Sequence, residues 1–313
     1  MSNVFANSLP SRRRPQGGPR VGDPANAFEM AEELRLDARG VSLRVVSWGN
    51  PQAPALILLH GFTGSAVSMA GVAEAFSGTY RVHALELVGH GESESPQDPA
   101  FYSMERCVEQ VLAVLDALEI QRAHFLGYSM GARAALCLAV AAPDRVASLV
   151  LIGVSPGFAD ARDRAERVEA DCALADRILE LGLEEFVDRW MALPLFESQK
   201  RLGARALAQA RNQRLASNPL GLANSLRGMG SGAMPPLVDS LPGLDLPVLL
   251  VAGREDVKFS AIANSLLLRF PQAELLEIAG AGHAAHLEQP RAFQAGCANF
   301  LASVLGPEPI ANS

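Results

Sequence analysis

The stretch that decides the fold is AHFLGYSMGARAALCLAVA, residues 123–141. His124–Tyr128 is a short apolar run that predicts a strand, and Met130–Ala141 predicts a helix. Between them, Gly127-Tyr128-Ser129-Met130-Gly131 matches the pattern G-x-S-x-G. In this context the pattern indicates a sharp strand-to-helix turn that lifts the serine above the sheet, while the glycines leave room for the close approach of backbone. Ser129 is therefore the candidate nucleophile.

Further strands and helices alternate on both sides of this stretch. Since buried strands that alternate with helices favour a parallel sheet with both faces covered, we expect an α/β fold. The expected strands are Val41–Val46, Ala55–Leu59, Arg81–Leu87, Ala147–Val154, Pro247–Ala252 and Ala273–Ile278, and the expected helices include Ser103–Leu118, Ala261–Phe270 and Pro290–Leu305.

The middle of the chain breaks the alternation. From about residue 158 to 236 the sequence is rich in Arg, Glu and Ala and shows a helical pattern without a convincing strand. We therefore expect residues 29–157 and 237–306 to form one α/β core, and residues 158–236 to form a helical cap inserted between two strands. Residues 1–28 and 307–313 are expected to be tails.

Two further residues complete a catalytic triad with Ser129. Asp256 follows the strand at 247–252, and His283 lies in the small-residue loop Gly280-Ala281-Gly282 after the strand at 273–278. The order Ser, Asp, His along the chain is that of the α/β-hydrolases, in which a mostly parallel sheet is flanked by helices. Glu255 is the alternative acid, and we prefer Asp256 because it begins the loop.

An oxyanion hole is expected from the backbone amides of Met130, which follows the nucleophile, and Phe62, in the loop after an early strand. His60 and His90 are interpreted as structural residues of turns. His286 forms an H-x-x-H pair with His283, but no HExxH pattern or neighbouring cysteine supports a metal site, and we predict none.

Composition limits the partners. A net charge of −7 gives no basic footprint for nucleic acid, and no apolar run reaches the length of a membrane-spanning helix. Arg12–Arg14 resembles a twin-arginine export signal but lacks the apolar segment that should follow it. Four cysteines far apart indicate free thiols. We expect a cytoplasmic protein, a monomer or weak homo-oligomer, that acts on a small molecule.

Almost every cation is an arginine, since only residues 200 and 258 are lysines. Arg133 lies one helical turn after Ser129, where a cation opposes the helix dipole, so a role in binding a carboxylate is favoured. In the cap, Arg162 with Glu166 and Asp163 with Arg167 are spaced as i,i+4 ion pairs, which a solvated helix face explains. Arg214 and Arg227 are ambiguous on this basis.

Several motifs together resemble one family, the 2-succinyl-6-hydroxy-2,4-cyclohexadiene-1-carboxylate (SHCHC) synthases of menaquinone biosynthesis. The resemblance spans roughly residues 41–305. Its cap motifs carry the most information, because generic hydrolases have unrelated caps. The motifs are LHGFTGS (59–65), GYSMGAR (127–133), PLFESQK (194–200), NPLGLANSLRGMG (218–230), GREDVKF (253–259) and AGHAAHLE (281–288).

This resemblance implies a lyase that eliminates pyruvate from 2-succinyl-5-enolpyruvyl-6-hydroxy-3-cyclohexene-1-carboxylate to give SHCHC, without metal or organic cofactor. Ser129, activated by His283 and Asp256, would abstract a ring proton. The substrate carries three carboxylates, which guanidinium groups suit. By resemblance, the substrate-binding residues would be Arg133, Arg167, Arg214, Tyr128, Trp190 and Phe196.

Three positions depart from the family pattern: Ala132 replaces a usual glycine, Ser231 a common threonine, and Met234 a usual glutamine.

Two other functions could use the same residues as the proposed lyase. A hydrolase of esters or C–C bonds would use Ser129 as a true nucleophile, and a neutral ester would not need Arg167 and Arg214. A non-catalytic receptor on this fold is the third hypothesis, against which the complete triad argues.

Overall fold

The computed structural model describes residues 31–305 and contains one eight-stranded sheet with the order β1-β2-β4-β3-β5-β6-β7-β8. Strands β3 to β8 are parallel to one another, and β2 is antiparallel to both β1 and β4. The strands are β1 (Glu32–Asp37), β2 (Ser42–Trp48), β3 (Ala55–Leu59), β4 (Arg81–Leu85), β5 (Ala123–Tyr128), β6 (Val146–Ile152), β7 (Val248–Gly253) and β8 (Ala273–Ile278). The seven strands expected from the sequence are present, with ends that shift by at most two residues.

Strand β1 was not predicted from the sequence. Its sequence EELRLD alternates polar and apolar residues, and most of its residues are exposed or half-buried. It pairs only with β2, at the edge of the sheet. A strand at the edge of a sheet has a weak hydrophobic pattern, because one of its two edges has no neighbouring strand. The expected tails at residues 1–28 and 307–313 lie outside the described residues.

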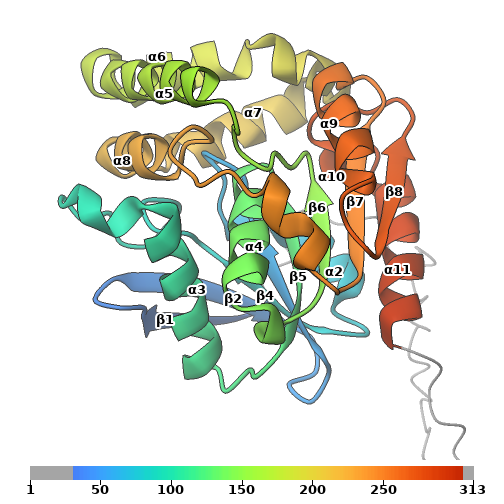
Figure 1. Cartoon of the computed structure of the whole chain (residues 1–313). Helices are drawn as coiled ribbons and strands as arrows, with labels where there is room; N and C mark the ends of the chain where they lie inside the picture. Colours follow the sequence, from blue (N-terminus) through green and yellow to red (C-terminus); the bar gives the residue numbers. More distant parts are fainter. Residues whose placement is uncertain (1–30, 306–313) are drawn as a thin grey trace, which may run out of the picture.

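Helices cover both faces of the sheet, as the continuous apolar strands require. In β3, Ile57 and Leu59 pack with α3 (Met104–Ala117), α4 (Met130–Ala141) and α9 (Val257–Leu267). Leu56 and Leu58 point to the other face, against α2 (Ala66–Phe76) and α11 (Pro290–Leu305). Figure 1 shows α3 and α4 in front of the sheet and α2 behind it.

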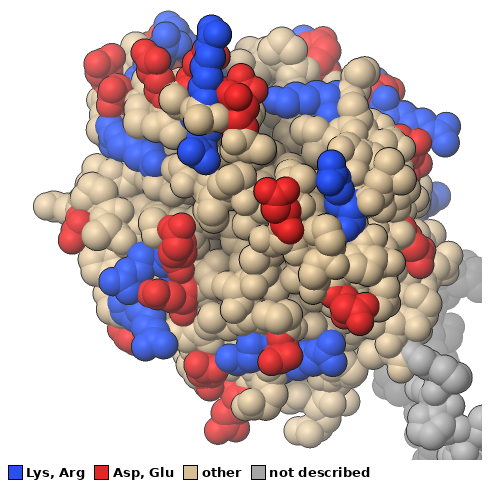
Figure 2. Space-filling model, viewed as in Figure 1, with Lys and Arg blue, Asp and Glu red and all other residues tan. Residues whose placement is uncertain are grey.

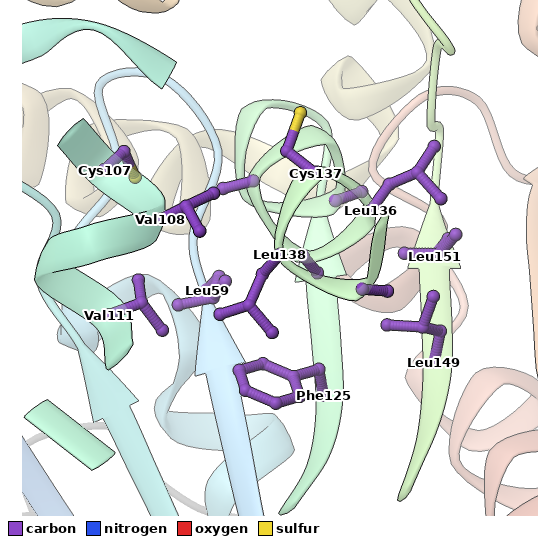
Figure 3. Close-up of a cluster of buried hydrophobic side chains, with 14 of the residues drawn as sticks. Leu59, Cys107, Val108, Val111, Phe125, Leu136, Cys137, Leu138, Leu149 and Leu151 are labelled. Atoms are coloured by element: carbon purple, nitrogen blue, oxygen red, sulfur yellow. The ribbon is translucent and has the colours of Figure 1, made fainter. Parts of the chain in front are cut away.

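Helix α4 is buried at nine of its twelve residues, because it packs on the centre of the sheet and against α3. Figure 3 shows Leu138 of α4 directed toward Phe125 of β5 and Leu59 of β3, with Leu149 and Leu151 of β6 on the other side. The small residues of AHFLGYSMGARAALCLAVA allow this close packing. Residues 123–141, which form β5 and α4, therefore lie in the core of the fold.

Between β6 and β7 the chain forms four α-helices and no strand. These are α5 (Ala161–Leu181), α6 (Leu183–Met191), α7 (Gly203–Leu215) and α8 (Pro219–Met229), called the cap helices below. Figure 1 shows them above the carboxyl ends of the parallel strands. Short 3-10 helices complete the fold at Pro99–Tyr102, Pro143–Arg145, Pro194–Leu202 and Val238–Gly243, with the short α10 at Ala285–Glu288.

Within residues 31–305, no helix is both long enough and apolar enough to cross a membrane. Figure 2 shows that positive and negative side chains are interspersed over the visible face, many of them side by side. This face therefore presents no extended field of one sign (Figure 2).

Five histidines are buried in the sheet and its loops. His83 shares a hydrogen bond with Ser47, and His124 shares one with Ser148, both at 2.8 Å. Desolvation lowers the pKa of His60, His83 and His124 from 6.5 to about 4, and that of His90 and His286 to about 3. Burial therefore keeps all five neutral near neutral pH.

This burial predicts a loss of stability in mild acid. The unfolded chain takes up protons near the ordinary histidine pKa of 6.5, while the folded histidines stay neutral down to about 4 or 3. Because the unfolded state binds more protons in this range, the free energy of unfolding should fall as the pH drops through it, by on the order of 3 kcal/mol for His60 alone by pH 4.

Denaturant titrations between about pH 7 and about pH 5.5 measure this effect before most carboxylates titrate. An unfolding free energy that stays constant over this window would contradict it.

Candidate active site

The structure brings Ser129, His283 and Asp256 together at the carboxyl ends of three strands. Nε2 of His283 lies 3.0 Å from Oγ of Ser129, and Nδ1 of His283 lies 2.7 Å from Oδ2 of Asp256. His283 is only 3% exposed and Asp256 9%. With Nδ1–H donating to the carboxylate, Nε2 is free to accept the Ser129 proton, which is the arrangement that activates a serine.

The turn at Ser129 is strained in the manner that the G-x-S-x-G pattern predicts. Ser129 has φ +50° and ψ −103°, an unfavourable conformation for a residue with a side chain. Its amide donates to the Ile152 carbonyl oxygen at 2.8 Å, which ties the turn to β6. A Cβ atom at Gly131 would overlap the Leu59 carbonyl oxygen, so this position requires glycine for α4 to begin so close to β3.

Asp256 is held by its place at the start of α9. Its Oδ1 accepts a hydrogen bond from the Phe259 amide at 3.2 Å, so the carboxylate caps the helix with one oxygen and binds His283 with the other. Glu255, the alternative acid, points away and forms an ion pair with Arg201 at 2.8 Å on the surface. The geometry therefore favours Asp256 as the acid.

Gly153, at the end of β6, makes room for the imidazole of His283. It has φ +59°, and a Cβ atom there would lie 2.7 Å from Cε1 of His283. Sequence reasoning did not single out this residue. The only available signal was a glycine directly after an apolar strand, which is compatible with many ordinary turns.

Phe62 and Met130, whose amides are expected to form the oxyanion hole, line the same cavity as Ser129. Within residues 31–305, neither the Phe62 nor the Met130 amide donates to another protein group. The loop that carries Phe62 is fixed by His60, whose Nδ1 contacts the Gly61 carbonyl oxygen at 2.8 Å and whose Nε2 accepts from the Leu87 amide at 3.1 Å. Its buried, neutral ring supports the interpretation of His60 as a structural residue.

A cavity of about 670 Å³ opens above Ser129, between the sheet and the cap helices. Six aromatic side chains contribute to its wall: Phe62, Tyr128, Phe158, Trp190, Phe196 and Phe259. Its wall also includes four cationic side chains and no aspartate or glutamate; the cations are Arg133, Arg167, Lys258 and Arg269. A partly apolar cavity with several convergent cations suits an organic polyanion.

Arg133 and Arg167 both line the cavity, and both lie near Asp171. Nη1 of Arg133 donates to the Met229 carbonyl oxygen at 2.5 Å, and burial lowers the pKa of Arg133 to about 10, so the group remains charged at neutral pH. Arg162 pairs with Glu166 as predicted, at 2.9 Å. The predicted pairing of Arg167 with Asp163 is wrong, because Arg167 binds the buried carboxylate of Asp171, one turn further along.

Arg214 is the predicted substrate residue that does not line this cavity. It lies on α7, where Nη1 donates to the Ala210 carbonyl oxygen at 2.9 Å, and its burial lowers its pKa while the nearby Tyr128 hydroxyl opposes that shift. Met234 is also buried rather than in the cavity wall, with its sulfur 3.9 Å from Nη1 of Arg133. A substrate-binding role for Arg214 therefore stays a prediction.

His286 packs against Tyr128, with the ring centroids 4.6 Å apart. It is not one of the residues that line the cavity above Ser129. In the described part of the chain, no group of three or more His, Cys, Asp or Glu side chains is arranged to hold a metal ion. The second histidine of the H-x-x-H pair, His286, therefore has a packing role.

Comparisons with known proteins agree with this geometry. The family described as the alpha/beta hydrolase fold matches residues 54–290. The chain is 39% identical over 265 residues to the putative SHCHC synthase of Bacillus subtilis, covering 85% of this chain and 96% of that protein. It is 33% identical over 257 residues to the SHCHC synthase of Salmonella agona, covering 82% and 96%.

The chain belongs to the SHCHC synthase family. The solved structure of MenH from S. aureus also matches, with a TM-score of 0.80 and 31% identity over 84% of this chain and 99% of that one. The predicted α/β-hydrolase fold and the resemblance stated from the motifs are thereby confirmed, and the protein is an enzyme.

Lys258 and Arg269 are two cations of the cavity wall that the sequence analysis did not assign to the site.

Replacing Gly153 with alanine tests whether this glycine positions His283. The added methyl group should displace the imidazole from Ser129, and we expect at least a ten-fold slower reaction of Ser129 with phenylmethylsulfonyl fluoride. The matched control is Gly71→Ala in α2, where a Cβ meets nothing within 4 Å. Equal labelling rates in both variants and the unmodified enzyme would show that Gly153 has no such role.

Proposed function

We propose that this member of the SHCHC synthase family eliminates pyruvate from 2-succinyl-5-enolpyruvyl-6-hydroxy-3-cyclohexene-1-carboxylate to form SHCHC. The observation that carries the proposal is the wall of the cavity above Ser129, where cationic side chains face a serine bound to histidine and no carboxylate is present. The relatives named as SHCHC synthases support the same reaction. The proposed setting is the cytoplasm.

In this proposal the triad acts as a base. The Ser129 oxygen removes the ring proton next to the succinyl carbonyl while its own proton passes to Nε2 of His283. Asp256, 2.7 Å from Nδ1, stabilises the imidazolium that forms. The amides of Phe62 and Met130 would hold the negative charge that develops on the succinyl oxygen.

The electron pair of the broken C–H bond then moves through the ring and expels the enolpyruvyl oxygen. The C–O bond breaks, two conjugated double bonds remain in the ring, and the leaving group departs as the enolate of pyruvate. The proton held by His283 returns to Ser129 after Ser129 gives its own proton to the enolate. Protons and electrons balance without an oxidant or a covalent serine intermediate.

The cations supply the binding energy for this trianionic substrate. Arg133 lies on the helix that begins at Ser129, and Arg167 is oriented by Asp171, so both guanidinium groups are positioned before the substrate arrives. We further propose that residues 158–236 act as a cap, because Arg167, Trp190 and Phe196 come from this segment to cover the cavity.

The decisive experiment supplies the enolpyruvyl substrate and follows release of pyruvate together with diene absorbance. The proposal requires both signals to appear at equal rates. The hydrolase alternative uses the same hydrogen-bonded serine as a nucleophile, so p-nitrophenyl acetate is tested in parallel. Fast ester cleavage without pyruvate release would replace the lyase with a hydrolase.

Arg133→Ala should lower kcat/KM for the enolpyruvyl substrate by about 100-fold, since a buried charge-assisted hydrogen bond to a carboxylate is lost. Arg162→Ala is the matched control, because Arg162 is exposed on the same face of the molecule as other cap arginines and binds only Glu166. Steady-state kinetics measure both variants. Full activity in Arg133→Ala would remove Arg133 from the site.

A further inference from the structure

Lys258 is a cation of the cavity wall without an acidic partner. It belongs to the first turn of α9, where a positive charge opposes the helix dipole, so helix stability does not explain it. Within residues 31–305, Lys258 forms no ion pair and no side-chain hydrogen bond, whereas Arg167 is bound to Asp171. Its ammonium group is therefore available to a ligand.

The ammonium group of Lys258 contacts one aromatic ring. Its Nζ lies 5.6 Å from the centre of the Phe259 ring, and a cation is attracted to the face of such a ring. The Phe259 ring centroid in turn lies 4.4 Å from that of His283. The cation–π contact thus places the lysine head on Phe259, the residue of α9 whose ring packs on His283.

The proposed substrate brings three carboxylates into the cavity, and Arg133 and Arg167 are two of the cations in its wall, whereas Arg214 lies outside the wall. A carboxylate that faced α9 without a partner would lose its hydration and gain nothing in return. Lys258 is the cation of the first turn of α9, next in sequence to Phe259, whose ring packs on His283.

On the basis of the proposed function, we infer that Lys258 binds the third carboxylate of the substrate, the one that Arg133 and Arg167 do not pair. It is a binding residue that determines specificity for a trianion. Because its side chain is exposed, the interaction is screened by solvent, and its contribution is smaller than that of buried Arg133.

Arg162 provides a matched control outside the cavity. Its side chain is exposed on helix α5, pairs with Glu166 and does not line the cavity. Removing either charge changes the net charge of the protein equally, so a general loss of positive charge should act alike in both variants.

The test compares Lys258→Met, Lys258→Arg and Arg162→Met in the elimination assay. We expect Lys258→Met to raise KM about 5- to 10-fold with kcat changed less than about 2-fold, and to weaken the rise of KM with added salt. Lys258→Arg should restore KM to within about 2-fold, and Arg162→Met should resemble the unmodified enzyme.

Inhibition by pyruvate, succinate and cyclohex-3-ene-1-carboxylate identifies which carboxylate Lys258 binds. The inhibition constant of the matching compound should rise in Lys258→Met and stay unchanged in Arg162→Met. An unchanged KM in Lys258→Met, or an equal rise in both methionine variants, overturns the inference. If the unmodified enzyme releases no pyruvate, the proposed function itself fails, which is a different result.

Discussion

The hydrogen bond between His283 and Ser129 sets the main constraint on the whole structure. The two residues are 154 positions apart in sequence, and their atoms must meet at 3.0 Å. This requires the ends of β5, β7 and β8 to be fixed relative to one another. The parallel sheet supplies that rigidity, because each strand is hydrogen-bonded to its neighbours and covered on both faces.

Small residues are the means by which this constraint is met. Gly131 lets α4 begin against β3, and Gly153 leaves the space that the imidazole occupies. Ser129 accepts a strained conformation at the same place. The strain is offset by the surrounding core, since α4 is almost fully buried and the Ser129 amide is bonded to β6. A well-packed core thus supports an unfavourable local backbone.

The sequence predicted the parallel core, and it selected three residues that the structure brings together, because both depend on local patterns. An apolar strand followed by G-x-S-x-G, and the order of Ser129, Asp256 and His283, are visible without knowing which segments meet. Strand β1 was not predicted, since an exposed edge strand lacks that pattern. The cations of the cavity wall were harder to predict than strand β1. The spacing of Arg167 with Asp163 and with Asp171 is equally suited to an ion pair, and only burial of Asp171 decides between them.

Asp256 has two functions whose consequences extend beyond its own side chain. One carboxylate oxygen binds His283, and the other caps α9, the helix that carries Phe259 and Lys258. The carboxylate that binds His283 and the helix that carries Lys258 are therefore linked through one side chain. Under the proposed function, a substitution at Asp256 would change two properties together, proton transfer and recognition of the anion. Kinetic losses in such a variant cannot be divided between them without a second substitution in α9.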